Sequence, residues 1–124
     1  MGGRKNTLIS YKIIPDNTVA ASMDTKAAPT NVMWLDNAGI TFQWSPAVNG
    51  TLQVLVSNDN VIGDAVHPVV NWTVLDFGVS IIVDNTNTNL LINMNQLPFR
   101  WLAIAYTHGS GVGTISAQLS SKEV

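Results

Sequence analysis

The chain has 124 residues, a formal net charge of -2 and no cysteine. Its length suits one domain, and the missing cysteine excludes disulfides, thiolate metal sites and a cysteine nucleophile. Charged residues make up 11% of the chain, against about a quarter in a typical domain. A surface of neutral amides and hydroxyls loses less hydration free energy than a charged one when a partner covers it, and it repels copies of itself weakly. The composition therefore favours a protein partner and argues against nucleic acid, which requires a basic stripe.

The N-terminal part of the chain has the least regular pattern. Residues 6–14 and 22–28 fit edge strands or an extended arm, and residues 32–35 fit a further strand. We therefore divide the chain into an N-terminal arm or set of edge strands at residues 1–30 and a β-sandwich domain at residues 31–124. No apolar run approaches the roughly 20 residues of a membrane span, so we expect no membrane partner.

Residues 40–57 show the period-2 alternation of half-buried strands. Ile40, Phe42 and Trp44 share one face of a first strand, and residues 51–57 alternate in the same way. Each segment therefore fits a strand with one buried face.

The connection between these strands contains Asn49-Gly50, a turn signal because both residues tolerate positive φ. The segment therefore reads as a hairpin, or as two strands joined by a loop at residues 46–50. The sequence leaves both open.

The middle of the chain alternates short strands with turn formers. Residues 57–60 are Ser-Asn-Asp-Asn, and residues 61–71, with Gly63 and Pro68, indicate an irregular connection. A polar turn is expected at residues 84–89. Three shorter strands are predicted, at residues 71–76, 79–83 and 90–94.

The last third of the chain is the most regular. Residues 99–107 form a long strand that is apolar on both faces, as expected of a central strand in a covered sheet. Residues 108–113 are a Gly-rich turn, and residues 114–120 alternate cleanly. The chain is therefore predicted to be all-β, a β-sandwich or jelly roll of about eight strands with a less regular N-terminal arm.

The sequence contains no recognisable catalytic group. His67 and His108 are the side chains that titrate near neutrality, and each lies in an expected loop with no metal-ligand spacing around it. We therefore expect no enzyme activity and assign no catalytic residue, no cofactor and no metal.

Three aspartates that precede asparagine, Asp36, Asp59 and Asp84, are expected to close turns on the backbone. Residues 57–64 and 84–89 are also rich in the oxygen ligands that calcium prefers. Turn chemistry accounts for both runs, and neither matches a calcium-loop pattern, although the sequence does not exclude calcium.

The four tryptophans are candidates either for the core or for a stacking platform. Trp44 continues the inward face of its strand and Trp101 lies in the long central strand, so we expect both in the core. Trp34 and Trp72 are instead candidates for a partner interface, where tryptophan is enriched.

The C-terminal two-thirds of the chain, residues 40–122, resembles small structural proteins of tailed bacteriophages. Four motifs carry the resemblance: a G-x-L-x-x-x-x-S-N-D strand, an N-W segment, an aromatic–R–aromatic strand that ends in Y-T, and a closing S-G-x-G-T hairpin. They stand at residues 50–59, 71–73, 99–107 and 110–122. The chain departs from the family at position 103, where a basic or polar residue is expected and Ala103 stands.

The resemblance implies a capsid decoration (cement) protein, that is, a non-enzymatic virion protein that binds the outer shell and stabilises it as a homo-oligomer. Its partners would be the major capsid protein and itself, as a dimer or trimer, and it would be made in the host cytoplasm and carried on the capsid surface. A terminal arm often anchors such proteins, so residues 1–30 are the candidate anchor. The candidate partner contacts are Tyr11, Ile13, Ile14, Trp34, Trp72 and Ala103.

Two other functions remain open at this point. The tryptophans and Asn-rich loops also suit a carbohydrate-binding β-sandwich at a phage fibre or tail tip. A tail or neck adaptor would share the same pattern of strands but form rings.

Overall fold

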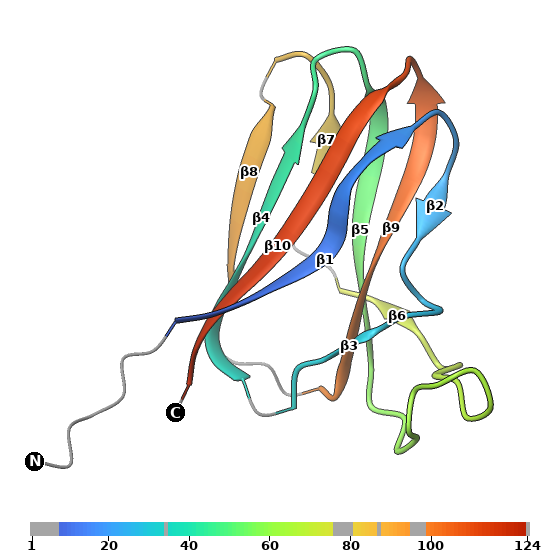
Figure 1. Cartoon of the computed structure of the whole chain (residues 1–124), viewed down its shortest axis with the longest axis vertical. Coiled ribbons are helices and arrows are strands. Elements are labelled where there is room, and N and C mark those ends of the chain that lie inside the picture. Colours follow the sequence, from blue (N-terminus) through green and yellow to red (C-terminus); the bar gives the residue numbers. More distant parts are fainter. Residues whose placement is uncertain (1–7, 34, 76–80, 87, 95–98, 124) are drawn as a thin grey trace, which may run out of the picture.

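The computed structural model describes residues 8–33, 35–75, 81–86, 88–94 and 99–123 (Figure 1). Within these ranges the chain forms strands and connections, and no helix among them is long and apolar enough to cross a membrane. The strands are β1 Leu8–Val19, β2 Met23–Asp24, β3 Thr30–Asn31, β4 Leu35–Trp44, β5 Asn49–Ser57, β6 Thr73–Val74, β7 Ile81–Val83, β8 Asn89–Met94, β9 Trp101–Ser110 and β10 Gly113–Glu123.

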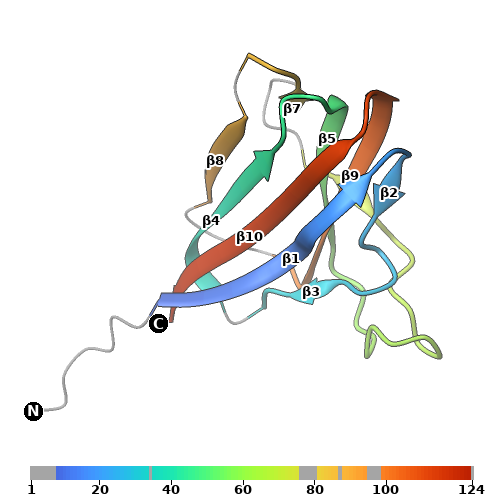
Figure 2. The same cartoon turned by 45° about the horizontal axis from the view of Figure 1, so that its top comes forward.

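The strands form two antiparallel sheets. The first has the order β1-β10-β4-β8, and its strands lie side by side in Figure 2. The second places β9 and β5 at its centre, with β2 and β3 on the outer side of β9 and with β6 and β7 on the outer side of β5.

This topology is a jelly roll. Strands β2 and β3 occupy one position in the second sheet, and β6 and β7 occupy another, so the fold has eight strand positions along the chain. In that count the first sheet runs 1-8-3-6 and the second 2-7-4-5. Two four-stranded sheets interleaved in this way are the jelly-roll arrangement. The predicted fold class is therefore confirmed.

The core lies between the sheets and is built from the alternating faces that the sequence predicts. Ile40, Phe42 and Trp44 of β4 are buried, as are Ile115, Ala117 and Leu119 of β10. From the second sheet come three side chains of β9 and two of β5. These are Leu102, Ile104, Tyr106, Leu52 and Val54. Burial of apolar area on this scale is the main stabilising contribution available to a chain without disulfides.

The strands β4 and β5 belong to different sheets, so residues 40–57 are not a hairpin. They are two strands joined by a connection, the second of the two alternatives. The turn lies at Ser45–Val48, where the Val48 amide donates to the Ser45 carbonyl at 3.2 Å. The turn predicted at Asn49-Gly50 is wrong, because both residues are already in β5.

The closing hairpin expected near residue 110 is also absent. Strand β9 ends at Ser110 in the second sheet and β10 begins at Gly113 in the first, so the connection crosses from one sheet to the other. Gly111 has a φ of 82°, and a β-carbon there would collide with the Ala47 carbonyl oxygen. Glycine is therefore required at this crossing.

The described part of the predicted N-terminal arm consists of edge strands. Strand β1 pairs with β10 along its length, and β2 and β3 pair with β9. Residues 8–31 thus follow the edge-strand alternative of that prediction and are integral to the two sheets.

Candidate contact surface

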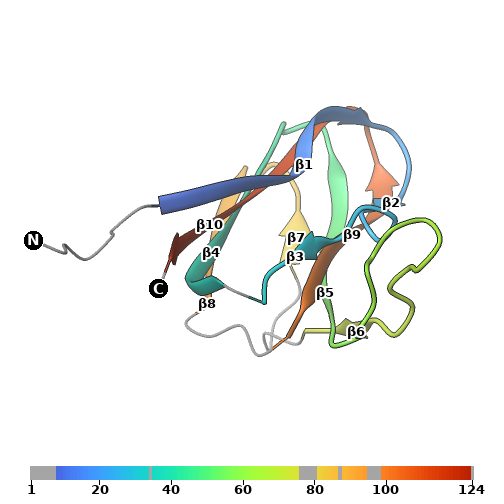
Figure 3. The same ribbon diagram turned by 60° about the horizontal axis from the view of Figure 1, so that its bottom comes forward.

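The connection between β5 and β6 is the largest irregular segment that the structure describes. Its ends are joined by Asp59, whose carboxylate accepts hydrogen bonds from the Val70 amide at 2.9 Å, the Asn71 amide at 3.0 Å and the Asn71 side-chain amide at 2.8 Å. A compact surface loop with its ends held close together is an Ω-loop, a type that is often functional. We call it the 59–71 loop (Figure 3).

The hydrogen bonds to Asp59 act on its charged form. The Asn71 amide, then the Val70 amide and the Asn71 side chain, lower the pKa of the Asp59 carboxyl below its ordinary value, against a smaller opposing effect of burial. The carboxylate is therefore ionised at neutral pH and keeps both ends of the loop in place.

A second set of contacts fixes the near half of the loop against the outer face of the second sheet. The Trp101 indole N–H donates to the Asp59 carbonyl at 3.1 Å, and Gly63, with a φ of 84°, lies over the Trp101 ring. The Asp64 carboxylate accepts from the amides of Val66 and His67 at 3.1 and 2.6 Å. These contacts give the loop one defined shape.

This fixed loop presents aliphatic side chains to solvent. Val61 is 37% exposed, Ile62 67%, Val66 78% and Val70 68%. Singly exposed apolar residues are ordinary, but several on one ordered loop make that loop a candidate contact surface. Because the loop is already ordered, it would lose little further conformational entropy when a partner binds. The sequence analysis missed this site because it read residues 61–71 only as an irregular connection. The run of Val and Ile with a single charged residue was the available signal.

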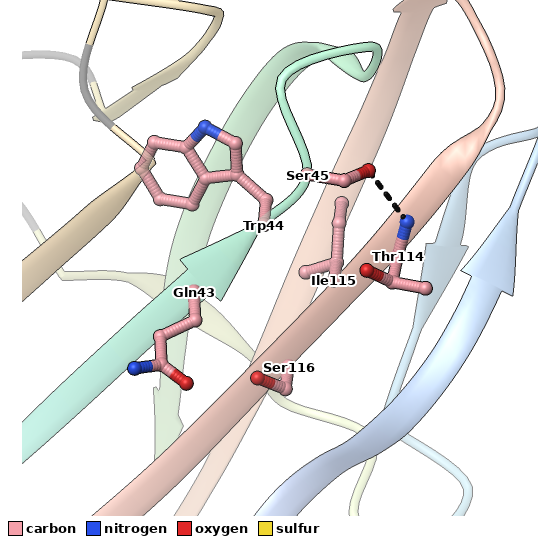
Figure 4. Close-up of a pocket in the computed structure, with 6 residues that line it drawn as sticks. All are labelled: Gln43, Trp44, Ser45, Thr114, Ile115 and Ser116. Carbon is pink, nitrogen blue, oxygen red and sulfur yellow. Dashed lines mark hydrogen bonds between the residues drawn. The ribbon is translucent and has the colours of Figure 1, made fainter.

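Where β4 ends and β10 begins, the first sheet carries polar but uncharged side chains on its outer face. A shallow pocket of about 210 Å³ lies there, lined by Gln43, Trp44, Ser45, Thr114, Ile115 and Ser116 (Figure 4). The Ser45 hydroxyl accepts from the Thr114 amide at 3.0 Å, and the Trp44 indole donates to the Asp84 carbonyl at 2.8 Å. None of the six lining residues is an acid or a base, so the pocket offers no general acid–base pair.

The two histidines differ in their surroundings. His67 is an exposed loop residue, as predicted, with its Nδ1 3.5 Å from an Asp64 carboxylate oxygen. His108 is not in a turn but in β9, where its Nδ1 lies 2.8 Å from the Tyr106 hydroxyl. That hydroxyl also donates to the Asn49 carbonyl at 3.0 Å, and burial raises the pKa of Tyr106. The pair fastens β9 to the start of β5 and does not open into a described cavity.

Asp24, Asp59, Asp64 and Asp84 accept hydrogen bonds from backbone amides. Asp36, also expected to close a turn, lies in strand β4 instead. Asp84 accepts from the Thr86 amide at 2.9 Å and Asp24 from the Lys26 amide at 3.0 Å, which are local turns. Asp59 instead bonds residues 11 and 12 positions away, which the turn interpretation did not foresee. Within the described ranges no group of three or more His, Asp or Glu residues is placed to hold a metal ion.

The described candidate contact residues come from separate elements of the fold. Tyr11, Ile13 and Ile14 lie on the edge strand β1, and Trp34 lies outside the described residues. Ala103 is fully buried in the middle of β9, opposite Leu55. Its selection as a partner contact is therefore wrong, because the chain covers that position itself.

The three described tryptophans are buried or half-buried in the fold. Trp44 is 7% exposed and lies in the core between the sheets, as predicted. Trp101 is 8% exposed, but it lies on the opposite face of β9 from Leu102 and Ile104, beneath the 59–71 loop. Trp72 is half-buried, and its indole nitrogen is buried without a hydrogen-bond partner among the described residues.

The fold and this surface define a small jelly-roll protein that presents an ordered, apolar loop. No family model matches the sequence, and no curated protein matches it. Among solved structures, the crystal structure of the SPBc2 prophage-derived protein YomS is similar, with a TM-score of 0.57 and 12% sequence identity over 93% of this chain and 94% of that one. At this identity the likeness concerns the fold.

Proposed function

We propose that the chain is a non-enzymatic structural protein of a bacteriophage virion, specifically a capsid decoration protein. It binds the major capsid protein on the outer shell and stabilises the shell as a homo-oligomer. It is made in the host cytoplasm and carried on the virion, and neither nucleic acid nor a membrane is its partner.

The observation that carries the proposal is the 59–71 loop, which is both ordered and apolar. A decoration protein has to offset the loss of translational and rotational freedom on docking, which costs at least about 4 kcal/mol. Burying exposed Val and Ile side chains stabilises a complex by about 1.5–3 kcal/mol each. The loop displays four such side chains, which are between 37% and 78% exposed. Each can contribute only the corresponding part of that value, and together they can offset a docking cost near the lower end of this range.

Two further observations support a phage origin. The motif order of residues 40–122 resembles that of small phage structural proteins, and the similar fold of YomS comes from a prophage.

The low charge and net charge of -2 also suit a protein partner better than nucleic acid.

Carbohydrate binding receives less support. A stacking platform needs aromatic faces open to solvent, whereas Trp44 and Trp101 are buried and Trp72 is half-buried.

Binding to phage heads tests the proposal. The purified protein should co-sediment with heads of the source phage that were assembled without it. The double substitution Ile62→Ser, Val66→Ser should weaken this binding at least about ten-fold, because tenfold in affinity corresponds to about 1.4 kcal/mol.

Val112→Ser is the matched control. Val112 is 58% exposed but lies between β9 and β10, away from the loop, so its replacement should leave head binding unchanged. The capsid role would be contradicted if the wild-type protein did not co-sediment with heads. Capture on isolated tails would favour the adaptor, and binding to a glycan would favour the carbohydrate-binding alternative.

A further inference from the structure

The four sheet edges differ in how well they are protected from pairing with another chain. Strand β1 contains Lys12 and Pro15 and shows two register shifts against β10. The edge strands of the second sheet, namely β2, β3, β6 and β7, are only two or three residues long. Charge, proline, bulges and short length are the usual means by which proteins prevent edge-to-edge association.

Strand β8 has none of these protections. It spans six residues, Asn89–Met94, with no charged residue and no proline, and it pairs with β4 without a register shift. It forms the outer edge of the first sheet. The β4 residues opposite it, Ala38–Gln43, are also uncharged.

The backbone groups of β8 that point away from β4, toward the outer edge of the described sheet, belong to alternate residues. The Trp44 amide donates to the Thr88 carbonyl at 2.9 Å, which places Thr88 in a hydrogen-bonded pair with β4. Antiparallel pairs alternate between bonded and non-bonded, so Asn89, Leu91 and Asn93 direct their N–H and C=O groups away from β4.

The outward-facing residues of this edge are arranged symmetrically about its centre. Residues 89–93 read Asn-Leu-Leu-Ile-Asn, with Asn89 and Asn93 at equal distances from Leu91. Side chains of Asn89, Leu91 and Asn93 are exposed, and Leu91 is 59% exposed. Leu90 and Ile92 are partly buried against the core.

We propose that β8 is the interface between two copies of this chain, which pair antiparallel about a two-fold axis at Leu91. Such an interface is self-complementary. Leu91 would face Leu91 of the second copy, and Asn89 would face Asn93 of the second copy, with about six backbone hydrogen bonds between the strands. No like charges would meet, and the two first sheets would become one continuous sheet. The inference rests on the self-association in the proposed function and names its interface, but it does not need the capsid.

The test compares Leu91→Lys with Ile82→Lys in the full chain. Ile82 is a matched control because it is 58% exposed and lies on β7, in the other sheet. By analytical ultracentrifugation the wild type and Ile82→Lys should be dimers. Leu91→Lys, which opposes two ammonium groups at the axis, should be a monomer with unchanged circular dichroism.

The register is tested by cross-linking. Because the chain has no cysteine, Leu91→Cys introduces a single thiol, which a short bis-maleimide should join into a covalent dimer. Ile82→Cys should not cross-link. Equal cross-linking of both variants, or a dimer or trimer that survives Leu91→Lys, would overturn the β8 interface while leaving self-association standing. A wild type that is monomeric at every concentration would overturn both, whereas the head-binding assay tests the capsid role separately.

Discussion

Gly50 shows how a single position joins the two central strands of the second sheet. A β-carbon at this residue would collide with the Thr107 carbonyl oxygen and lie 2.6 Å from Cε1 of Tyr106. The absence of a side chain therefore lets β5 start directly against β9. The Tyr106 hydroxyl then reaches the Asn49 carbonyl at 3.0 Å. Glycine is needed here for close approach and not for a turn.

We predict that Gly50→Ala destabilises the fold by about 1–3 kcal/mol, the usual cost of overpacking. The measurement is the urea midpoint of unfolding. Gly39→Ala is the control, since its β-carbon would lie 3.3 Å from the mobile end of Leu91, and we expect it to change stability by less than about 1 kcal/mol. Equal midpoints for wild type and Gly50→Ala would contradict the close-packing role of Gly50.

At the scale of the element, the 59–71 loop owes its shape to one carboxylate and one indole. Asp59 joins residues near the two ends of the loop, and Trp101 anchors the Asp59 carbonyl to the sheet. The exposed aliphatic side chains depend on this scaffold for their position. In the proposed function, loop order is therefore a condition for binding the capsid.

The lowered pKa of Asp59 predicts that loop order depends on pH. A depressed folded-state pKa contributes stability above the ordinary carboxyl value, about 3.9, and that contribution is lost as pH falls through the folded pKa. In wild-type protein, hydrogen-exchange protection of the Val70 and Asn71 amides should therefore be high at neutral pH and fall in acid.

Asp59→Asn should remove that protection at neutral pH and abolish its acid dependence. The new amide would replace one acceptor oxygen and face the side-chain amide of Asn71. Asp24→Asn, which alters a local turn elsewhere, is the control and should leave the loop protected. Full protection of the Val70 amide in Asp59→Asn would contradict the role given to this carboxylate.

At the scale of the whole molecule, the sequence predicted the strands better than their arrangement. Alternation at Ile40, Phe42 and Trp44 identifies a buried face because successive side chains of a strand point to opposite sides. It does not say which sheet a strand joins, and so β4 and β5 were compatible with a hairpin. Sheet membership depends on contacts between distant residues, such as those of β1 with β10.

The candidate site was hidden from the sequence for the same reason. Asp59 resembles an ordinary turn residue until Val70 and Asn71 are brought back to it. Ala103 was selected from its place in a motif, and the burial that excludes it came from the pairing of β9 with β5. Local patterns predict local structure, whereas a surface is assembled from several segments.

The central claim is that this jelly roll binds a virion shell through its 59–71 loop. Cryo-electron microscopy of the source virion tests it most directly. We predict density for the sandwich on the outer face of the capsid, with Ile62 and Val66 against the major capsid protein. Virions that contain no density for the chain on the capsid, or that show it with this loop facing solvent, would contradict the claim.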